Sequence, residues 1–376
     1  MGPWQPPSHL RAPRAHRPRS RPPPTGMTGE HYTMGDTVTV QPFGETFPVE
    51  PGETVLSAIL RNGRFVKYGC KHGGCSTCRA EVVEGDFTQS DGTSFSLSDA
   101  DRDAGVVLLC STYPEGDLVV DVSDTMDDLT DEEYNAGQNI VEFTGTVDRI
   151  VDYTHDIAGI EIKLDEPSNI TFVPGQYIEV QVPGSDDEWR SFSMANPPSI
   201  SSRVHLVVRV IPGGRFTSQV GKEIAEGTTM KLRGPLGQFA IRLSYRPIIF
   251  IAGGSGIAPV LSMLADLIES NNERPATFLY GARTAADLPM VDKLRELENE
   301  HDWFTFIPAL SDPDDTPWDG ETGLITEVLK RHFPSTKGHE SYLCGPPAMI
   351  DAALDVLTSS GCKDRHIFFD RFVPSG

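Results

Sequence analysis

Cysteine is the residue type with the most informative spacing in this chain of 376 residues. Cys70, Cys75 and Cys78 follow a C-x4-C-x2-C pattern in a glycine-rich segment, and Cys110 follows further along the chain. Three thiolates from one loop and a fourth from a separate segment form the ligand set of a 2Fe-2S cluster. Glycine suits such a loop because it accepts unusual backbone angles and brings N–H groups close to sulfur. The spacing therefore predicts a one-electron redox centre.

Other uses of these thiols fit the sequence less well. Nothing in the chain indicates the oxidising compartment that disulfides need. Zinc sites usually combine two separated pairs of ligands, whereas Cys110 stands alone. His72 completes a C-x-H with Cys70, which is half of a Rieske motif, but the chain contains no C-x-x-H to supply the other half. We interpret His72 as a solvated loop residue and Cys362 as a residue at the end of a helix.

The segments around the cysteines predict a small domain. Residues 36–43 and 46–49 alternate between apolar and polar, as in a hairpin, and Val55, Leu56, Ile59 and Leu60 form one helical face. Asn62-Gly63 would end that helix. Together, residues 35–122 resemble a plant-type ferredoxin domain. The resemblance implies an α+β (β-grasp) fold whose cluster is held by the four cysteines.

A second unit of alternating strands follows from residue 140. Pro and Gly separate these strands, and this pattern predicts an antiparallel β-barrel over residues 140–243. The expected strands are Val141–Ile150, Ile160–Leu164, Tyr177–Val182, Val204–Val210 and Met230–Arg233.

One motif of this unit resembles a flavin signature. Arg190 to Asn196 read R-S-F-S-M-A-N, which matches the R-x-(Y/F)-S-x-x-N pattern of the ferredoxin-NADP reductase superfamily. The resemblance implies that Arg190 pairs with the flavin phosphate, Phe192 packs on the cofactor and Ser193 hydrogen-bonds near flavin N5. Phe192 lacks the hydroxyl of the more common Tyr, and taken alone the motif also fits an ordinary strand with a surface arginine. The further flavin-binding candidates are Tyr177, Asn196, Gly213, Gly214 and Thr217.

The remaining residues, 244–376, alternate in βαβ fashion. A strand at 247–252 leads into G-G-S-G-I-A-P, residues 253–259, and then into an apolar helix. Glycine N–H groups and a helix N-terminus at this point would bind a pyrophosphate. Further strands are expected at 277–281, 304–309, 342–345 and 367–369. The pattern predicts a doubly wound parallel sheet with helices on both faces.

The nucleotide-binding candidates come from the same superfamily resemblance. Cys344 in C-G-P-P would flank the reactive nicotinamide, although a buried structural cysteine is the alternative. Phe369 in the terminal F-F-D-R-F would cover the flavin, although core packing would also explain these aromatic residues. Arg283 is the one clear basic candidate near the adenosine ribose, with Asp287 in the same loop, and we expect NADH rather than NADPH. The residues expected to bind the dinucleotide are Gly253, Gly254, Gly256, Pro259, Gly281, Arg283, Gly345 and Pro346.

The order of the units points to a function. A ferredoxin domain followed by flavin and nucleotide domains resembles the reductase components of benzoate-type dioxygenases and of soluble di-iron monooxygenases. That resemblance implies an oxidoreductase that takes hydride from NADH onto FAD (FMN being less expected). It then passes single electrons through the 2Fe-2S cluster to a separate terminal oxygenase.

Several alternatives stay open for the partner and the role. We favour a di-iron monooxygenase of the phenol, alkene or alkane type as the partner. A Rieske aromatic-ring dioxygenase and a sugar-deoxygenation dehydrase are alternatives. A membrane quinone reductase with this domain order would carry an N-terminal spanning helix, which the sequence lacks. An iron–sulfur redox sensor would leave the flavin and nucleotide motifs unused.

Charge limits the remaining possibilities. The formal net charge is −22, which argues against nucleic acid as a partner, and no apolar run is long enough to span a membrane. We expect a cytoplasmic protein. Residues 1–34 form a Pro- and Arg-rich leader, read as an upstream start or a disordered tail rather than a transit peptide. Residues 123–139 form an acidic linker, within a stretch from Arg102 to Arg149 that has twelve carboxylates and no basic residue between its ends. This stretch either is a solvated connection or steers docking onto a basic partner.

Overall fold

The fold is taken from a computed structural model, which describes most of the chain after the leader. The described residues are 36–68, 71, 73, 77–90, 97, 99–123, 140–313 and 317–372. Within them, no helix is long and apolar enough to cross a membrane. The predicted leader, residues 124–139 of the predicted linker, and Cys70, His72 and Cys75 lie outside the described residues.

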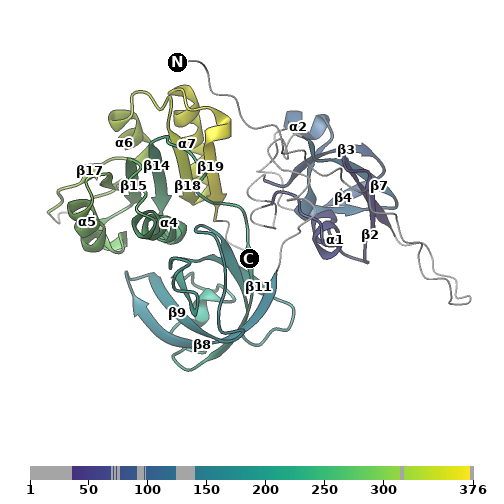
Figure 1. Cartoon of the computed structure of the whole chain (residues 1–376), viewed down its shortest axis with the longest axis horizontal. Coiled ribbons are helices and arrows are strands. Elements are labelled where there is room, and N and C mark those ends of the chain that lie inside the picture. Colours follow the sequence, from purple (N-terminus) through teal and green to yellow (C-terminus); the bar gives the residue numbers. More distant parts are fainter. Residues whose placement is uncertain are drawn as a thin grey trace, which may run out of the picture. The chain divides into compact units, whose positions relative to one another are not determined.

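The first domain contains a five-stranded sheet of order β2-β1-β7-β3-β5, and a separate pair β4-β6 (Figure 1). The predicted hairpin is present, with Val38 opposite Phe47, and β1 pairs in parallel with β7. Helix α1 begins after Thr54, whose hydroxyl accepts a hydrogen bond from the Ser57 N–H, and its apolar face is buried. The elements are β1 (Thr37–Gln41), β2 (Glu45–Pro48), α1 (Val55–Arg61), β3 (Arg79–Glu84), β4 (Phe87–Gln89), α2 (Asp99–Asp103), β5 (Val106–Leu108), η2 (Leu109–Ser111), β6 (Thr112–Pro114) and β7 (Leu118–Asp121).

The second domain is a six-stranded antiparallel sheet of order β11-β10-β13-β8-β9-β12. A bridge between Met194 and Leu206 joins its two ends, so the sheet curls into the predicted barrel. Side chains such as Ile178 and Val180 fill its interior. The elements are β8 (Val141–Asp152), β9 (Ile157–Glu166), β10 (Tyr177–Gln181), β11 (Trp189–Ser193), β12 (Arg203–Arg209), η4 (Thr217–Gln219) and β13 (Thr229–Leu236).

The third domain has the predicted parallel sheet, of order β17-β16-β15-β14-β18-β19. Helices α4 and α5 contribute to the core on one face, and α6 and α7 to the core on the other (Figure 1). The elements are β14 (Ile248–Gly253), η5 (Gly254–Gly256), α4 (Ile257–Glu269), β15 (Ala276–Ala282), η6 (Ala285–Asp287), α5 (Val291–Glu300), β16 (Phe304–Leu310), β17 (Glu321–Thr322), α6 (Ile325–His332), β18 (Glu340–Gly345), α7 (Pro347–Ser359), η7 (Asp364–His366) and β19 (Ile367–Arg371).

A buried ion pair ties the connection between barrel and nucleotide domain to the parallel sheet. The Arg274 guanidinium donates to Glu340 Oε2 at 2.8 Å and to the backbone oxygens of Arg246 and Arg242 at 2.9 and 3.0 Å. Tyr342 also donates its hydroxyl to Glu340, at 3.0 Å. The segment that leaves the barrel is thereby fixed to the domain that follows it.

Candidate redox and nucleotide sites

Two of the predicted cluster cysteines, Cys78 and Cys110, lie in the described part of the first domain. Cys78 precedes β3 and Cys110 lies in η2, and both are buried. The Leu109 N–H donates to the Cys78 oxygen at 2.9 Å, and the Gly73 N–H donates to Cys110 Sγ at 3.2 Å. The backbone N–H at the Cys110 thiol fits a 2Fe-2S cluster, because such contacts stabilise the charge on its sulfur ligands. None of the four cysteines in the described part forms a disulfide.

The flavin motif lies on β11, at one end of the curled sheet. Ser193 is buried and lies opposite Tyr177 of the neighbouring strand β10. The ring of Phe192 packs against Phe216 at a centroid distance of 4.8 Å. Gly175 precedes β10 with a φ of +98°, and a Cβ there would lie 2.0 Å from the Phe239 oxygen, so only glycine fits this turn.

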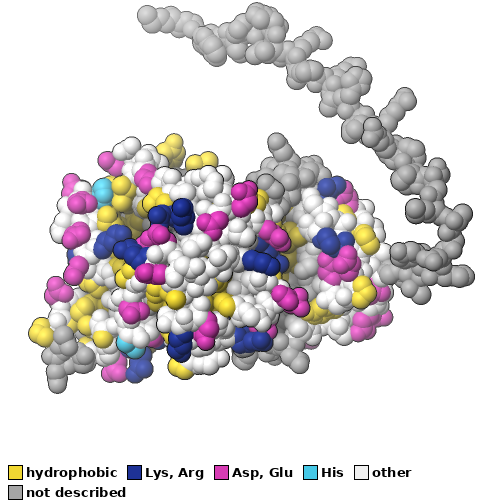
Figure 2. Space-filling model, turned by 90° about the horizontal axis from the view of Figure 1, so that it is seen from below, with side chains coloured by type: hydrophobic (Ala, Val, Ile, Leu, Met, Phe, Trp, Pro, Cys, Tyr) yellow, Lys and Arg dark blue, Asp and Glu magenta, His cyan; other side chains and the backbone are white. Residues whose placement is uncertain are grey.

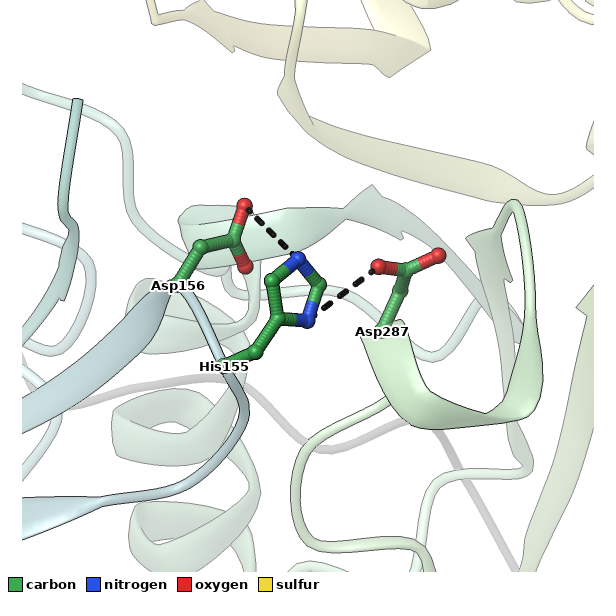
Figure 3. Close-up of side chains that lie close together, drawn as sticks. All are labelled: His155, Asp156 and Asp287. Atoms are coloured by element: carbon green, nitrogen blue, oxygen red, sulfur yellow. Dashed lines mark ion pairs between the residues drawn. The ribbon is translucent and has the colours of Figure 1, made fainter. Parts of the chain in front are cut away.

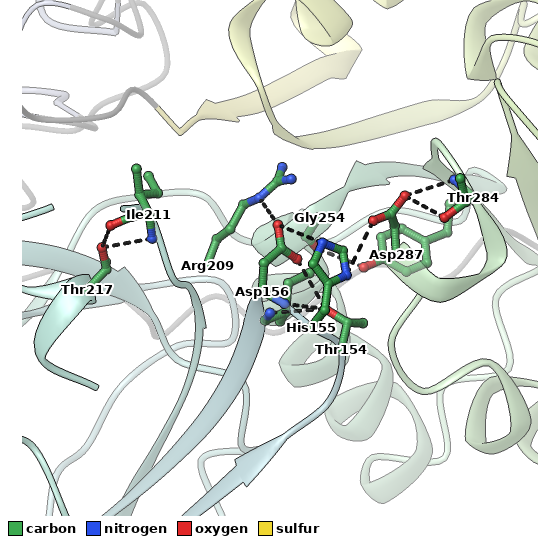
Figure 4. Close-up of polar contacts among 11 residues, drawn as sticks. Thr154, His155, Asp156, Arg209, Ile211, Thr217, Gly254, Thr284 and Asp287 are labelled. Atoms are coloured by element: carbon green, nitrogen blue, oxygen red, sulfur yellow. Dashed lines mark hydrogen bonds and ion pairs between the residues drawn. The ribbon is translucent and has the colours of Figure 1, made fainter. Parts of the chain in front are cut away.

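A group of charged and glycine residues lies beside the motif, as expected for a phosphate site. Arg190 Nη2 is 3.8 Å from Glu188 Oε2, and Arg215 forms an ion pair with the other oxygen of Glu188. Two guanidinium groups against one carboxylate leave positive charge for an anion. Gly213 has a φ of +77°, and a Cβ on Gly214 would lie 2.4 Å from Thr217 Oγ1. Thr217 itself accepts a hydrogen bond from the Ile211 N–H at 3.1 Å, which fixes this turn (Figure 4).

The role of Asn196 in binding the cofactor stays a prediction, and the structure shows several protein contacts of its side chain. Its amide nitrogen donates to the backbone oxygens of Pro197, Ile200 and Arg203, and its amide oxygen accepts from the His205 N–H. Its backbone oxygen accepts from Ser262 Oγ of α4 at 2.7 Å. Asn196 therefore orders the barrel and links it to the nucleotide domain.

The glycine loop connects β14 to α4 and lies against the end of β18. A Cβ on Gly256 would lie 2.2 Å from the Cys344 oxygen, so this residue permits the close approach of loop and strand. Tyr280 donates its hydroxyl to the Gly254 oxygen at 2.7 Å and holds the loop from β15. Pro259 is buried in the first turn of α4, where proline is tolerated.

Cys344 is fully buried at the end of β18. Burial, with a further contribution from the Asp370 carboxylate, raises the pKa of its thiol well above the usual range. The thiol is therefore protonated at neutral pH and acts as a small neutral group rather than a nucleophile. Gly345 and Pro346 follow it and lead into α7.

The C-terminal strand β19 places its two adjacent phenylalanines on different faces. Phe368 stacks on Tyr342 at a centroid distance of 5.0 Å, on the face that α4 covers. Phe369 packs with the core on the α7 face, and the Arg371 guanidinium lies over its ring. The role of Phe369 as the flavin cover stays a prediction, and Phe368 lies on the face whose core includes barrel residues.

A cavity of about 220 Å³ lies between the barrel and the nucleotide domain. Five predicted nucleotide-binding residues line it: Gly253, Gly254, Gly281, Arg283 and Pro346. Gly256, Pro259 and Gly345 are not among its lining residues. Arg283 is mostly exposed and lies 3.5 Å from Asp312.

Barrel residues that sequence reasoning did not select also line this cavity. The Arg209 Nε donates to Asp156 Oδ2 at 2.8 Å, and Asp156 and Asp287 flank His155 at 3.9 and 3.7 Å (Figure 3). Figure 4 shows this group beside Gly254 and Thr284. Burial alone would raise the pKa of Asp287, but hydrogen bonds from Thr284 and nearby positive charges hold it below its usual value. No short motif marks these residues, because the contacts join segments far apart in the sequence.

Charged residues of both signs are distributed over the described surface. Figure 2 shows Asp and Glu side chains spread across the face in view, with Lys and Arg among them in small groups. Nucleic-acid binding usually requires a continuous basic patch.

Fold and site together define an oxidoreductase with separate iron–sulfur, flavin and pyridine-nucleotide domains. Three family models match these domains: the 2Fe-2S iron-sulfur cluster binding domain at residues 38–115, the oxidoreductase FAD-binding domain at 144–241 and the oxidoreductase NAD-binding domain at 250–355. The predicted fold classes and cofactor types are confirmed.

Whole-chain comparisons give the family. The chain is 40% identical over 342 residues to the reductase component DmpP of phenol 2-monooxygenase from Pseudomonas sp. (strain CF600), covering 90% of this chain and 95% of the relative. It is 37% identical to the propane 2-monooxygenase reductase component of Rhodococcus jostii (strain RHA1), covering 89% and 91%. The crystal structure of the Amycolatopsis cytochrome P450 reductase GcoB matches with a TM-score of 0.76 and 30% identity, covering 91% and 100%. The chain belongs to the family of three-domain reductase components of oxygenase systems.

Proposed function

We propose that this protein is the reductase component of a soluble di-iron monooxygenase that acts on a phenol or a small hydrocarbon. It takes electrons from NADH and delivers them singly to a separate hydroxylase. The observation that carries this proposal is the likeness over nine-tenths of the chain to the reductase components of phenol and propane monooxygenases. FAD, when bound, would accept hydride from the nicotinamide and release electrons one at a time to the 2Fe-2S cluster.

The chain's own residues would orient these groups. Ser193 would donate a hydrogen bond near flavin N5, and Arg190 with the Gly213–Gly214 turn would hold the flavin phosphate. The glycine loop at Gly254 and the N-terminus of α4 would bind the pyrophosphate of NADH. The neutral thiol of Cys344 would lie beside the nicotinamide and would add no negative charge there.

The four cysteines would hold the cluster. The buried Cys78 and Cys110 would supply two of the thiolates, and Cys70 and Cys75 would supply the others. The Gly73 N–H at Cys110 Sγ favours the added negative charge of the reduced state. The proposed domain boundaries are at residues 122, 140 and 243.

Reconstitution with purified oxygenases tests the proposal. The holoenzyme and NADH are supplied to a phenol-type di-iron hydroxylase and, in parallel, to a Rieske dioxygenase, and product is measured per NADH consumed. We expect coupled turnover with the di-iron hydroxylase and mostly uncoupled NADH oxidation with the Rieske enzyme. The reverse ranking would contradict the di-iron assignment while leaving the reductase chemistry in place.

One observation favours a second candidate. The chain is also 32% identical to the reductase component of the naphthalene 1,2-dioxygenase system of Pseudomonas putida, covering 90% of this chain and 98% of the relative. A Rieske dioxygenase is therefore the second candidate partner, and the parallel assay separates the two.

A further inference from the structure

Strand β10 presents two different faces to its surroundings. Ile178 and Val180 point into the barrel core, whereas Tyr177 belongs to the core cluster of the ferredoxin domain. Because side chains alternate along a strand, Glu179 shares the outer face with Tyr177. Glu179 is nevertheless buried, at 6% exposure. A carboxylate on the outside of a barrel is buried only if another part of the protein covers it.

Residues next to the cluster cysteines provide that cover. Lys71 Nζ lies 3.8 Å from Glu179 Oε1 and 5.4 Å from the centroid of the Tyr68 ring. The Tyr68 side chain is fully buried, in the same cluster as Tyr177, and its hydroxyl is hydrogen-bonded to the backbone of Gly237. Tyr68 and Lys71, which precede and follow Cys70 in the sequence, therefore both contact the flavin barrel.

The barrel side of this contact is itself ordered. Arg233 of β13 lies opposite Glu179 and donates from Nε to Glu179 Oε2 at 2.5 Å. The Arg233 guanidinium lies over the Trp189 ring, 4.3 Å from its centroid. One oxygen of Glu179 is therefore fixed by Arg233, and its other oxygen faces Lys71. Arg233 therefore holds the Glu179 carboxylate in position to form an ion pair with Lys71.

The backbone of Lys71 also indicates that this side chain is specifically placed. Its φ of +59° is in the left-handed region, where residues with a side chain are uncommon. The Lys71 side chain reaches the barrel and is only one-quarter exposed. An ordinary solvated loop lysine would have neither feature.

We propose that Lys71, Glu179 and Arg233 form a latch between the two domains. The latch holds the described residues beside Cys70, Tyr68 and Lys71, against the flavin barrel in the state that passes electrons from flavin to cluster. The three are positioning residues, since none of them holds a redox group. This inference rests on the proposed electron route and adds to it the surface through which the two redox domains of this chain meet.

The test uses the holoenzyme with Lys71→Gln, the conservative variant Lys71→Arg, and Lys231→Gln as a matched control. Lys231 is an exposed lysine on the same strand as Arg233. NADH is mixed anaerobically with each variant, and flavin reduction and cluster reduction are followed separately by absorbance. We expect K71Q to slow cluster reduction about fivefold with flavin reduction unchanged, while K71R and K231Q resemble the wild type. Raising the salt concentration should slow the wild type and leave K71Q unaffected.

Cluster reduction at the wild-type rate in K71Q, or an equal loss of flavin reduction, would overturn the latch. If K71Q fails to retain its cluster, Glu179→Gln removes the same ion pair from the barrel side, at a residue far along the chain from the cysteines. Cluster reduction at the wild-type rate in E179Q, or an equal loss of flavin reduction, would then overturn the latch. Hydrogen–deuterium exchange of the peptide with Tyr68 gives a readout without electron transfer. Faster exchange in E179Q supports the latch, and unchanged exchange contradicts it. A wild type that reduces its flavin but never its cluster would refute the electron route, and exchange would still test the contact.

Discussion

Replacing Gly256 by alanine tests how closely the glycine loop must approach the end of β18. The added Cβ would lie 2.2 Å from the Cys344 oxygen and 2.6 Å from the Cys344 carbonyl carbon, and both are backbone atoms. Ordinary contact begins at 3.4 Å, so the glycine loop and the end of β18 must separate by about 1 Å. No side-chain rotation can relieve this contact.

The size of the effect follows from that displacement. Overpacking of this kind lowers the free energy of unfolding by about 1–3 kcal/mol. We expect the variant still to fold. A misplacement of about 1 Å between reacting groups can lower a rate about a hundredfold. We therefore expect kcat/KM for NADH to fall about a hundredfold in Gly256→Ala while the flavin content stays normal.

Steady-state dye reduction by the holoenzyme measures this effect, with Gly253→Ala as the matched variant. A Cβ on Gly253 would meet the sulfur of Met349 at 3.0 Å, and that flexible side chain can move away. The loss in Gly253→Ala should be about tenfold smaller. A kcat/KM within threefold of the wild type in Gly256→Ala would refute the reasoning, and equal losses in both variants would show a general intolerance of the loop.

Three further predictions follow from the sites. Cys110→Ser should abolish cytochrome c reduction while leaving flavin-to-dye transfer, because serine is a poor cluster ligand; loss of both activities would contradict the domain division. Arg209→Gln should raise KM for NADH about tenfold with kcat nearly unchanged. Arg203→Gln, at the other end of β12, should leave KM unchanged, and equal effects of the two substitutions would exclude a direct contact between Arg209 and NADH. Because burial and Asp370 raise the pKa of Cys344, its thiol stays protonated as the pH rises past the usual cysteine value of about 8.5. Iodoacetamide should therefore react slowly even at about pH 9, and a rate like that of free cysteine would contradict this.

Several helices and strands were predictable from a long apolar run or a repeating apolar pattern. The β14 strand is an uninterrupted apolar run, and the structure buries all of its residues. Helix α1 was predicted from its apolar face and from Asn62-Gly63, and it ends at Arg61. Strands β4, β5, β6 and β17 were not predicted, because two or three residues cannot show an alternation. The longer strands β3, β7 and β11 were not predicted either.

The candidate sites were predictable only where they form a continuous motif. The glycine loop and Cys344 were found because their residues are adjacent in sequence, although their roles stay predictions. The pair of Asp156 and Arg209 was missed, since it joins residues 53 positions apart with no pattern around either. Asn196 fits its motif, but the sequence alone does not show that its side-chain amide is hydrogen-bonded to backbone groups.

The buried Arg274 has a consequence for how the protein unfolds. A guanidinium removed from water is tolerated only while its partners stay in place, and losing them costs several kcal/mol. Its partners include backbone oxygens of the connecting segment and Glu340 of the central sheet, so neither can loosen without exposing an uncompensated charge. The flavin barrel and the nucleotide domain are therefore coupled thermodynamically. We expect them to melt in a single cooperative calorimetric transition, which Arg274→Met would separate into two.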